Sequence, residues 1–84
     1  MNPENARIRW ACRRGMLELD IFLLPFFDNC YLQLTCEEKA VFVDFLTATD
    51  PELFAWLMAH HLPDKKEFIA IVDKIRAYRL HDKN

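Results

Sequence analysis

One glycine, Gly15, is present among the 84 residues of this chain, and only four prolines accompany it. Folds built from β-strands need many tight turns, and those turns draw heavily on glycine. The shortage of glycine therefore favours an all-α fold. An apolar content of 52% and an aromatic content of 13% are sufficient for a packed core and exclude a disordered chain. We expect one domain over residues 1–84, folded as a compact five-helix bundle.

Capping residues and apolar periodicity divide the chain into five predicted helices joined by short connections. Thr35 and Glu38 have the spacing of a capping box, so the third helix should begin after Thr35. Asp50, which precedes a proline, is expected to cap the fourth helix, and Asp64 the fifth. The predicted helices cover residues 3–14, 16–26, 35–48, 50–62 and 64–81, and the residues after about 81 should fray.

Pro25 interrupts the most apolar segment of the chain. Proline lacks a backbone donor and its ring clashes with the preceding turn, so the second helix should kink or stop there. A second short helical piece can follow over residues 26–34. For the adjacent Phe26 and Phe27 two arrangements are open. Either one ring stays near the surface, or both rings are buried in a kinked core element, and the second is favoured.

Charge is distributed unevenly along the chain. The formal net charge is -2, but residues 1–15 carry +3, residues 16–64 carry -8 and residues 65–84 carry +3. Duplex nucleic acid usually requires a broad cationic face, and this acidic middle does not supply one. The distribution suits a protein partner with mixed charges better.

The titratable side chains do not indicate an enzyme. Cys12, Cys30 and Cys36 form no CxxC pair, and none is spaced to work with a histidine as nucleophile and base. Cys12 and Cys36 are expected to be small core residues. The adjacent His60 and His61 point to different sides of a helix, so they cannot hold one metal ion together. We expect no catalytic residue and no metal site.

Location also follows from the sequence as an expectation. An odd number of cysteines without a secretory leader indicates a reducing, cytoplasmic compartment. The longest uncharged apolar run, residues 21–27, is far shorter than the roughly 20 residues that a membrane span needs. We therefore expect no membrane insertion.

The cluster Arg14-Gly15-x-x-Glu18 allows two interpretations. Gly15 can end one helix while the Glu18 carboxylate stabilises the positive end of the next, which requires no partner. Alternatively, the missing Cβ lets another backbone approach, and Arg14 and Glu18 fix its register through charge-assisted hydrogen bonds. The gathering of Arg and Trp at this end is not explained by the first interpretation, because both residues are enriched at interface hot spots. On the residues alone the two interpretations stand about level.

The run from Ala6 to Asp20 resembles the signature of the SdhE family. These are small bacterial FAD assembly factors for succinate dehydrogenase, related to mitochondrial succinate dehydrogenase assembly factor 2. The family motif RGxxE is matched by Arg14, Gly15 and Glu18. The similarity continues through residues 24–27, 35–39 and 50–58 and covers nearly the whole chain.

The resemblance implies a five-helix bundle that binds the flavoprotein subunit of succinate dehydrogenase, and also that of fumarate reductase. It implies that the chain promotes covalent attachment of FAD to a histidine of that client, with the chemistry autocatalytic in the client. The chain then needs no cofactor of its own, and we expect it to be a monomer when free. Arg14, Gly15 and Glu18 should face the client's flavin-binding region. Further candidates for this interface are Arg7, Trp10, Arg13, Asp20, Pro25, Phe27 and Asp28.

Two other functions remain as alternatives. One is an antitoxin-like regulatory protein that binds a small membrane-associated toxin. The other is a helical nucleic-acid-binding module, in which Arg7, Arg9, Arg13 and Arg14 with Trp10 would form a recognition helix.

Overall fold

The computed structural model describes residues 3–82, and over that range it contains helices and no strand. The predicted all-α class is therefore confirmed. The elements are α1 (Pro3–Cys12), α2 (Leu17–Cys30), the short 3₁₀ turn η1 (Tyr31–Gln33), α3 (Cys36–Phe45), α4 (Asp50–Leu57) and α5 (Lys66–Asp82). Of the residues predicted to fray after about 81, Asp82 is the last residue of α5, and residues 83 and 84 lie outside this range.

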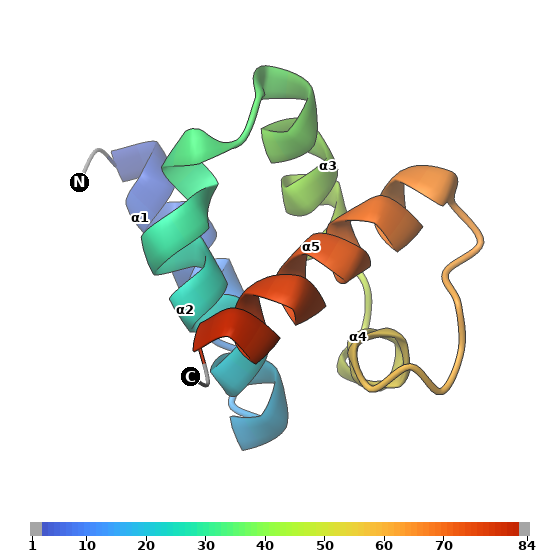
Figure 1. Cartoon of the computed structure of the whole chain (residues 1–84). Coiled ribbons are helices and arrows are strands. Elements are labelled where there is room, and N and C mark those ends of the chain that lie inside the picture. The colour runs from blue at the N-terminus through green and yellow to red at the C-terminus, as the bar shows by residue number, and fades with distance from the viewer. Residues whose placement is uncertain (1–2, 83–84) are drawn as a thin grey trace.

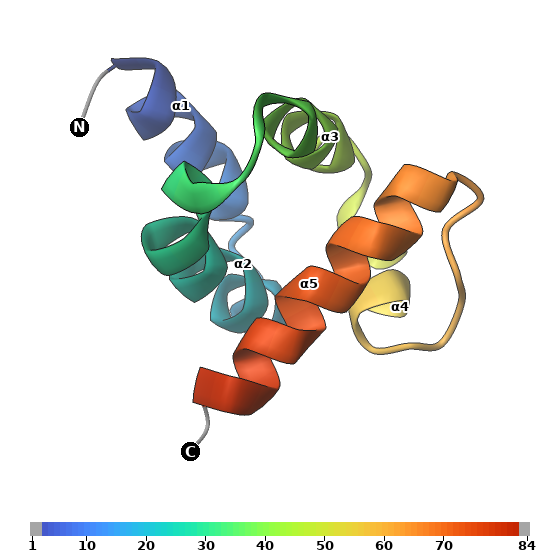
Figure 2. The same ribbon diagram turned by 45° about the horizontal axis from the view of Figure 1, so that its top comes forward.

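Helix α2 occupies the centre of the bundle. It packs against α1, α4 and α5, while α5 also packs against α3 and α4. Figures 1 and 2 show α5 crossing α2, with α1 on the far side of α2 and the long α4–α5 connection at the outer edge. This arrangement agrees with the apolar character of α2, which predicts a helix covered by its neighbours.

Aromatic rings form much of the core. Phe26 of α2 lies 5.6 Å from Phe42 of α3, and Phe45 of α3 lies 5.5 Å from Phe68 of α5, measured between ring centroids. Each fully buried ring contributes about 1.5–3 kcal/mol to folding. Because these pairs join α2, α3 and α5, they fix the relative positions of three helices.

Of the two outcomes predicted at Pro25, a kink or a stop, the stop does not occur, because α2 continues through this residue to Cys30. A proline inside a helix costs about 3 kcal/mol. Buried side chains on both sides of it outweigh that cost, since Leu23, Phe26 and Phe27 are all almost inaccessible to solvent. Both phenylalanines are thus in the core. The favoured prediction, that both rings are buried, is confirmed on this point.

The helix starts follow the predicted pattern with shifts of one or two residues. The capping box of Thr35 and Glu38 is present, with both reciprocal hydrogen bonds formed. In α4 the cap is Thr49 rather than Asp50, because the Thr49 hydroxyl accepts from the Glu52 N–H and forms a second capping box. Helix α5 begins at Lys66, two residues after the predicted cap Asp64.

Helix α4 ends at Leu57, well before Pro63. Ala59 adopts a left-handed backbone conformation with φ of 63°. The His60 N–H donates to the Ala55 carbonyl at 2.8 Å, and the Ala59 N–H donates to the Trp56 carbonyl at 3.2 Å. These two bonds are those of a Schellman motif, which ends a helix by reversing the chain. The predicted end of the fourth helix at residue 62 was therefore wrong.

The cysteines differ in their surroundings. Cys12 is fully buried, and this desolvation raises the pKa of its thiol to about 12. Such a thiol stays protonated at neutral pH and is a poor nucleophile. Cys36 was predicted to be a core residue but is exposed, because it occupies the first position of α3 at the edge of the bundle.

None of the helices described over residues 3–82 is both long and apolar enough to cross a membrane.

Candidate protein-binding site

The α1–α2 loop, residues 13–16, presents an open backbone at Gly15. This residue has φ of 79°, a conformation that L-residues rarely adopt. A Cβ placed on Gly15 would have no heavy atom within 4 Å, leaving aside its two chain neighbours. The surface at Gly15 is therefore accessible to another molecule, and no side chain among residues 3–82 covers it.

The loop begins earlier than predicted, because α1 ends at Cys12 and not at Arg14. The Arg13 N–H donates to the Trp10 carbonyl at 3.1 Å, which closes the last turn. The Arg14 N–H donates to Oδ1 of Asp20, one turn into α2, at 3.0 Å. Gly15 is thus not the residue that ends α1 but the middle of a loop tied to both flanking helices.

The Arg14 guanidinium is directed into the molecule. Its Nε donates to Oδ1 of Asp50 at 2.8 Å, and its two terminal nitrogens donate to the carbonyls of Leu46 and Ala48, each at 2.9 Å. A further bond of 3.2 Å reaches the Ala11 carbonyl. The side chain retains only 19% of its exposure. Arg14 was predicted to face the client, but in this structure it binds the α3–α4 connection.

Glu18 has the opposite character. It lies exposed in the first turn of α2, where its charge stabilises the positive helix end. In the described part of the chain its carboxylate has no hydrogen-bond or ion-pair partner. It is therefore available to a donor on another protein, three residues from the open glycine.

Exposed apolar and cationic side chains flank this loop. Trp10 near the end of α1 is 71% exposed, and the Arg13 guanidinium lies 5.9 Å from the centre of its ring. Arg7 is exposed one turn earlier on α1. Together with Gly15 and Glu18, these residues form what we call the loop surface.

Leu17 belongs to the loop surface too, and the sequence interpretation missed it. It is 71% exposed at the start of α2. The signal was available in the helical period, since Leu19 and Leu23 mark the buried face. A residue two positions before Leu19 falls on the opposite side of the helix.

Four further candidates are held within the bundle to different degrees. Phe27 is buried and stacks on Tyr31 with ring centroids 4.7 Å apart, so it is a core residue and not part of an exposed surface. Pro25 is half-buried inside α2. Asp20 accepts the Arg14 amide, as described above.

Asp28 is paired with Arg9 across α1 and α2. The guanidinium donates to both carboxylate oxygens, Nε at 2.7 Å and Nη2 at 3.0 Å. The hydrogen bond from Arg9 lowers the pKa of the Asp28 carboxyl below its ordinary value. This carboxylate is exposed, but its charge is already paired with Arg9 within the molecule.

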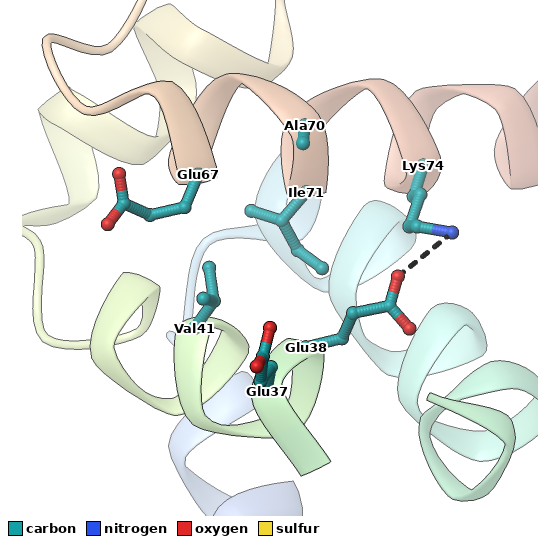
Figure 3. A pocket seen from close by; sticks show the side chains of 7 residues that line it. All are labelled: Glu37, Glu38, Val41, Glu67, Ala70, Ile71 and Lys74. Carbon is teal, nitrogen blue, oxygen red and sulfur yellow. Dashed lines mark ion pairs between the residues drawn. The ribbon is translucent and has the colours of Figure 1, made fainter. Parts of the chain in front are cut away.

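A hollow of about 200 Å³ lies between α3 and α5 (Figure 3). None of the residues that line it belongs to the loop surface. Figure 3 shows Glu38 of α3 reaching Lys74 of α5, and the two form an ion pair of 3.2 Å. Val41 of α3 and Ile71 of α5 supply aliphatic lining to the hollow. We assign no ligand to this hollow, because its polar rim is already paired in part and nothing converges on its centre. Over residues 3–82 no group of three or more His, Cys, Asp or Glu side chains is placed to hold a metal ion.

Over residues 3–82, an open glycine on the α1–α2 loop is flanked by an unpaired carboxylate and by exposed aromatic and aliphatic side chains of α1 and α2, and these features are typical of a protein-binding module. Comparison of the sequence with known protein families identifies the family within this class. The chain belongs to the Sdh5 family, described as the flavinator of succinate dehydrogenase, whose model matches residues 6–79.

Curated relatives agree with this assignment. The FAD assembly factor SdhE of Aliivibrio fischeri is 49% identical over 77 residues, which cover 92% of this chain and 90% of the relative. The protein of the same name from Vibrio cholerae is 51% identical with the same coverage. A solution structure of a protein described as UPF0350 superimposes with a TM-score of 0.78 at 48% identity and covers 98% of this chain and 88% of the other. The resemblance to the SdhE family found in the sequence is confirmed.

Proposed function

We propose that this chain is an assembly factor that binds the flavoprotein subunit of succinate dehydrogenase through the loop surface and promotes covalent attachment of FAD to it. The family and the curated relatives support the flavinylation role. The observation that carries the choice of surface is the open space above Gly15, where a partner backbone can approach without meeting a side chain.

The chain acts in this proposal by selecting a conformation of its client. A binding partner can shift a conformational equilibrium only by its differential affinity for the two states. The selected state holds the flavin and the acceptor histidine in position to react, and such orientation can supply several kcal/mol of barrier reduction. The bond then forms within the client, autocatalytically, so the assembly factor contributes no reacting group.

We also propose an oligomeric state, a location and a second client for this chain. The free chain is a monomer, it works in the cytoplasm, and the flavoprotein subunit of fumarate reductase is a second client. The exposed Trp10 and Leu17 supply apolar contact area, while the Glu18 carboxylate supplies a directed polar contact.

Co-expression with the client tests the proposed function. The flavoprotein subunit is produced with and without this chain, denatured, and separated by electrophoresis, and covalently bound flavin is read as in-gel fluorescence. We expect several-fold stronger fluorescence per amount of client when the chain is present. Equal fluorescence in a host that lacks any homologue would refute the role in flavinylation.

A further inference from the structure

The hydrogen-bonding capacity of Arg14 is nearly exhausted inside the molecule. A guanidinium carries five N–H donors and accepts nothing. Four hydrogen bonds leave it toward the carboxylate of Asp50 and the carbonyls of Ala11, Leu46 and Ala48. A bidentate contact to a partner carboxylate needs two free parallel donors, so it would require breaking this set.

Three of the four acceptors of the Arg14 side chain lie at helix ends, and the fourth, the Ala48 carbonyl, lies in the α3–α4 connection. Ala11 lies in the last turn of α1, Leu46 caps the end of α3, and Asp50 is the first residue of α4. The final carbonyls of a helix have no partner within the helix, and Arg14 satisfies them at two helix ends. The Asp20 carboxylate holds the Arg14 amide from the other side. Arg14 is therefore fixed at both its backbone and its side chain.

We propose that Arg14 is a positioning residue that acts with Asp50. Together they hold the α1–α2 loop against the α3–α4 connection, and they thereby keep Gly15 and Glu18 in the arrangement that the flavoprotein subunit binds. This inference rests on the proposed function and assigns different roles to the residues of the motif. Glu18 and Gly15 meet the client, while Arg14 faces inward and prepares the surface they share.

The consequence that separates this proposal from a direct contact concerns Asp50. This residue lies in α4, outside the motif, yet its removal should weaken client binding through the loop. Replacing Arg14 by lysine keeps the charge but removes the planar fork, so it should fail as well. Because a direct bidentate contact to a client carboxylate would also be weakened by lysine, Asp50→Ala is the variant that separates the two roles.

The test compares Arg14→Lys, Asp50→Ala and the double variant with the original chain in two measurements. The first is amide hydrogen exchange at residue 14 in the free protein, which reports whether the loop opens. The second is the affinity for the purified flavoprotein subunit. We expect exchange to become at least about tenfold faster in each single variant, close to the rate of an open loop. The affinity should fall about tenfold, because the binding-competent loop is then populated only about a tenth of the time.

The double variant should bind no more than about twofold more weakly than the weaker single variant, because both substitutions release the same clamp. Additive losses, client binding unchanged by Asp50→Ala, or binding retained by Arg14→Lys would each overturn the inference. Circular dichroism checks that the variants fold, and Asp50→Asn replaces Asp50→Ala if the latter does not.

Thr35→Ala provides the matched control. It removes the cap at the opposite end of α3 and lowers the unfolding temperature without touching the clamp. It should bind the client like the original chain, which separates loop positioning from general stability. If the original chain itself fails to bind the flavoprotein subunit, the proposed function falls, while the exchange rate at residue 14 still decides whether Arg14 and Asp50 hold the loop.

Discussion

Two connections in this bundle use a left-handed residue, Gly15 between α1 and α2 and Ala59 between α4 and α5. The α4–α5 connection is closed locally, by the hydrogen bonds that His60 and Ala59 donate back to the last turn of α4. The α1–α2 connection is instead held from a distance, by an arginine that reaches Asp50, 36 positions along the chain.

The difference teaches what a glycine is for in this fold. At Ala59 an L-residue is accommodated with φ of 63°, so a left-handed turn here does not by itself require glycine. At Gly15 the φ is 79° and the space above the backbone is empty. The loop with glycine is also the one flanked by an unpaired carboxylate and exposed apolar residues. A conformational role is therefore sufficient for Ala59, whereas the surroundings of Gly15 support a binding role.

Arginine placed at each of the two left-handed positions gives the largest expected effect. Gly15→Arg should weaken binding to the flavoprotein subunit at least about a hundredfold, or roughly 2.7 kcal/mol, because the side chain fills the surface that the client approaches. The fold should survive with a loss of about 1–2 kcal/mol from the strained backbone. Titration calorimetry and urea unfolding measure the two quantities.

Ala59→Arg is the matched control, since it adds the same side chain at another exposed left-handed position. It should leave client binding unchanged. If Gly15→Arg is unfolded, or if both variants lose binding equally, the distinction between the two connections is wrong.

The polar part of the loop surface is tested next by Glu18→Gln. This substitution keeps the shape and removes the charge. Because the Glu18 carboxylate has no hydrogen-bond or ion-pair partner in the described part of the chain, only its interaction with the positive helix end is lost, and the free energy of unfolding should fall by less than about 1 kcal/mol. Client affinity should fall about tenfold, in line with the loss of one charge-assisted hydrogen bond. Equal affinity of the two proteins would remove Glu18 from the interface.

Much of the fold could be predicted from the sequence, because its signals are local. The five helices, the capping box of Thr35 with Glu38 and the helix boundary near Gly15 each depend on residues within a few positions of one another. The continuation of α2 through Pro25 could not be predicted in this way. It depends on the burial of Phe26 and Phe27 against elements that are distant in sequence, and that burial outweighs a local preference.

The candidate site was predicted in part, for the same reason. The open Gly15 and the exposed Glu18 are local features, and the resemblance to a family drew attention to them. The inward direction of Arg14 depends on carbonyls 32 and 34 positions away, at Leu46 and Ala48, so only the folded chain reveals it. The exposure of Leu17 could have been read from the helical period of α2.

The α4–α5 connection offers a smaller, stabilising effect. Ala59→Gly removes the Cβ that opposes a left-handed conformation, so the free energy of unfolding should rise by about 0.5–1 kcal/mol. Client binding should not change, since this connection has only a structural role in the comparison. Thermal unfolding gives the stability, and Ala55→Gly, inside α4, is the control that should lose stability by a similar amount. A lower unfolding temperature for Ala59→Gly would contradict the prediction, because it would show that the Cβ of Ala59 does not destabilise the left-handed conformation at this position.

The smallest effect concerns the ion pair of Arg9 and Asp28, which joins the two helices flanking the α1–α2 connection. The hydrogen bond from Arg9 lowers the pKa of the Asp28 carboxyl in the folded state. Its contribution is therefore present above the ordinary aspartate pKa of about 3.9 and is lost as the pH falls through the lowered folded value. Asp28→Asn should reduce stability slightly at pH 7, and the gap to the original chain should close as the pH falls below about 4. Both groups are largely in water, so high salt should also reduce this difference in the free energy of unfolding.

Arg9→Gln is the control and should show the same dependence of stability on pH. A difference in stability that persists at low pH would mean that Asp28 contributes by packing instead of by charge.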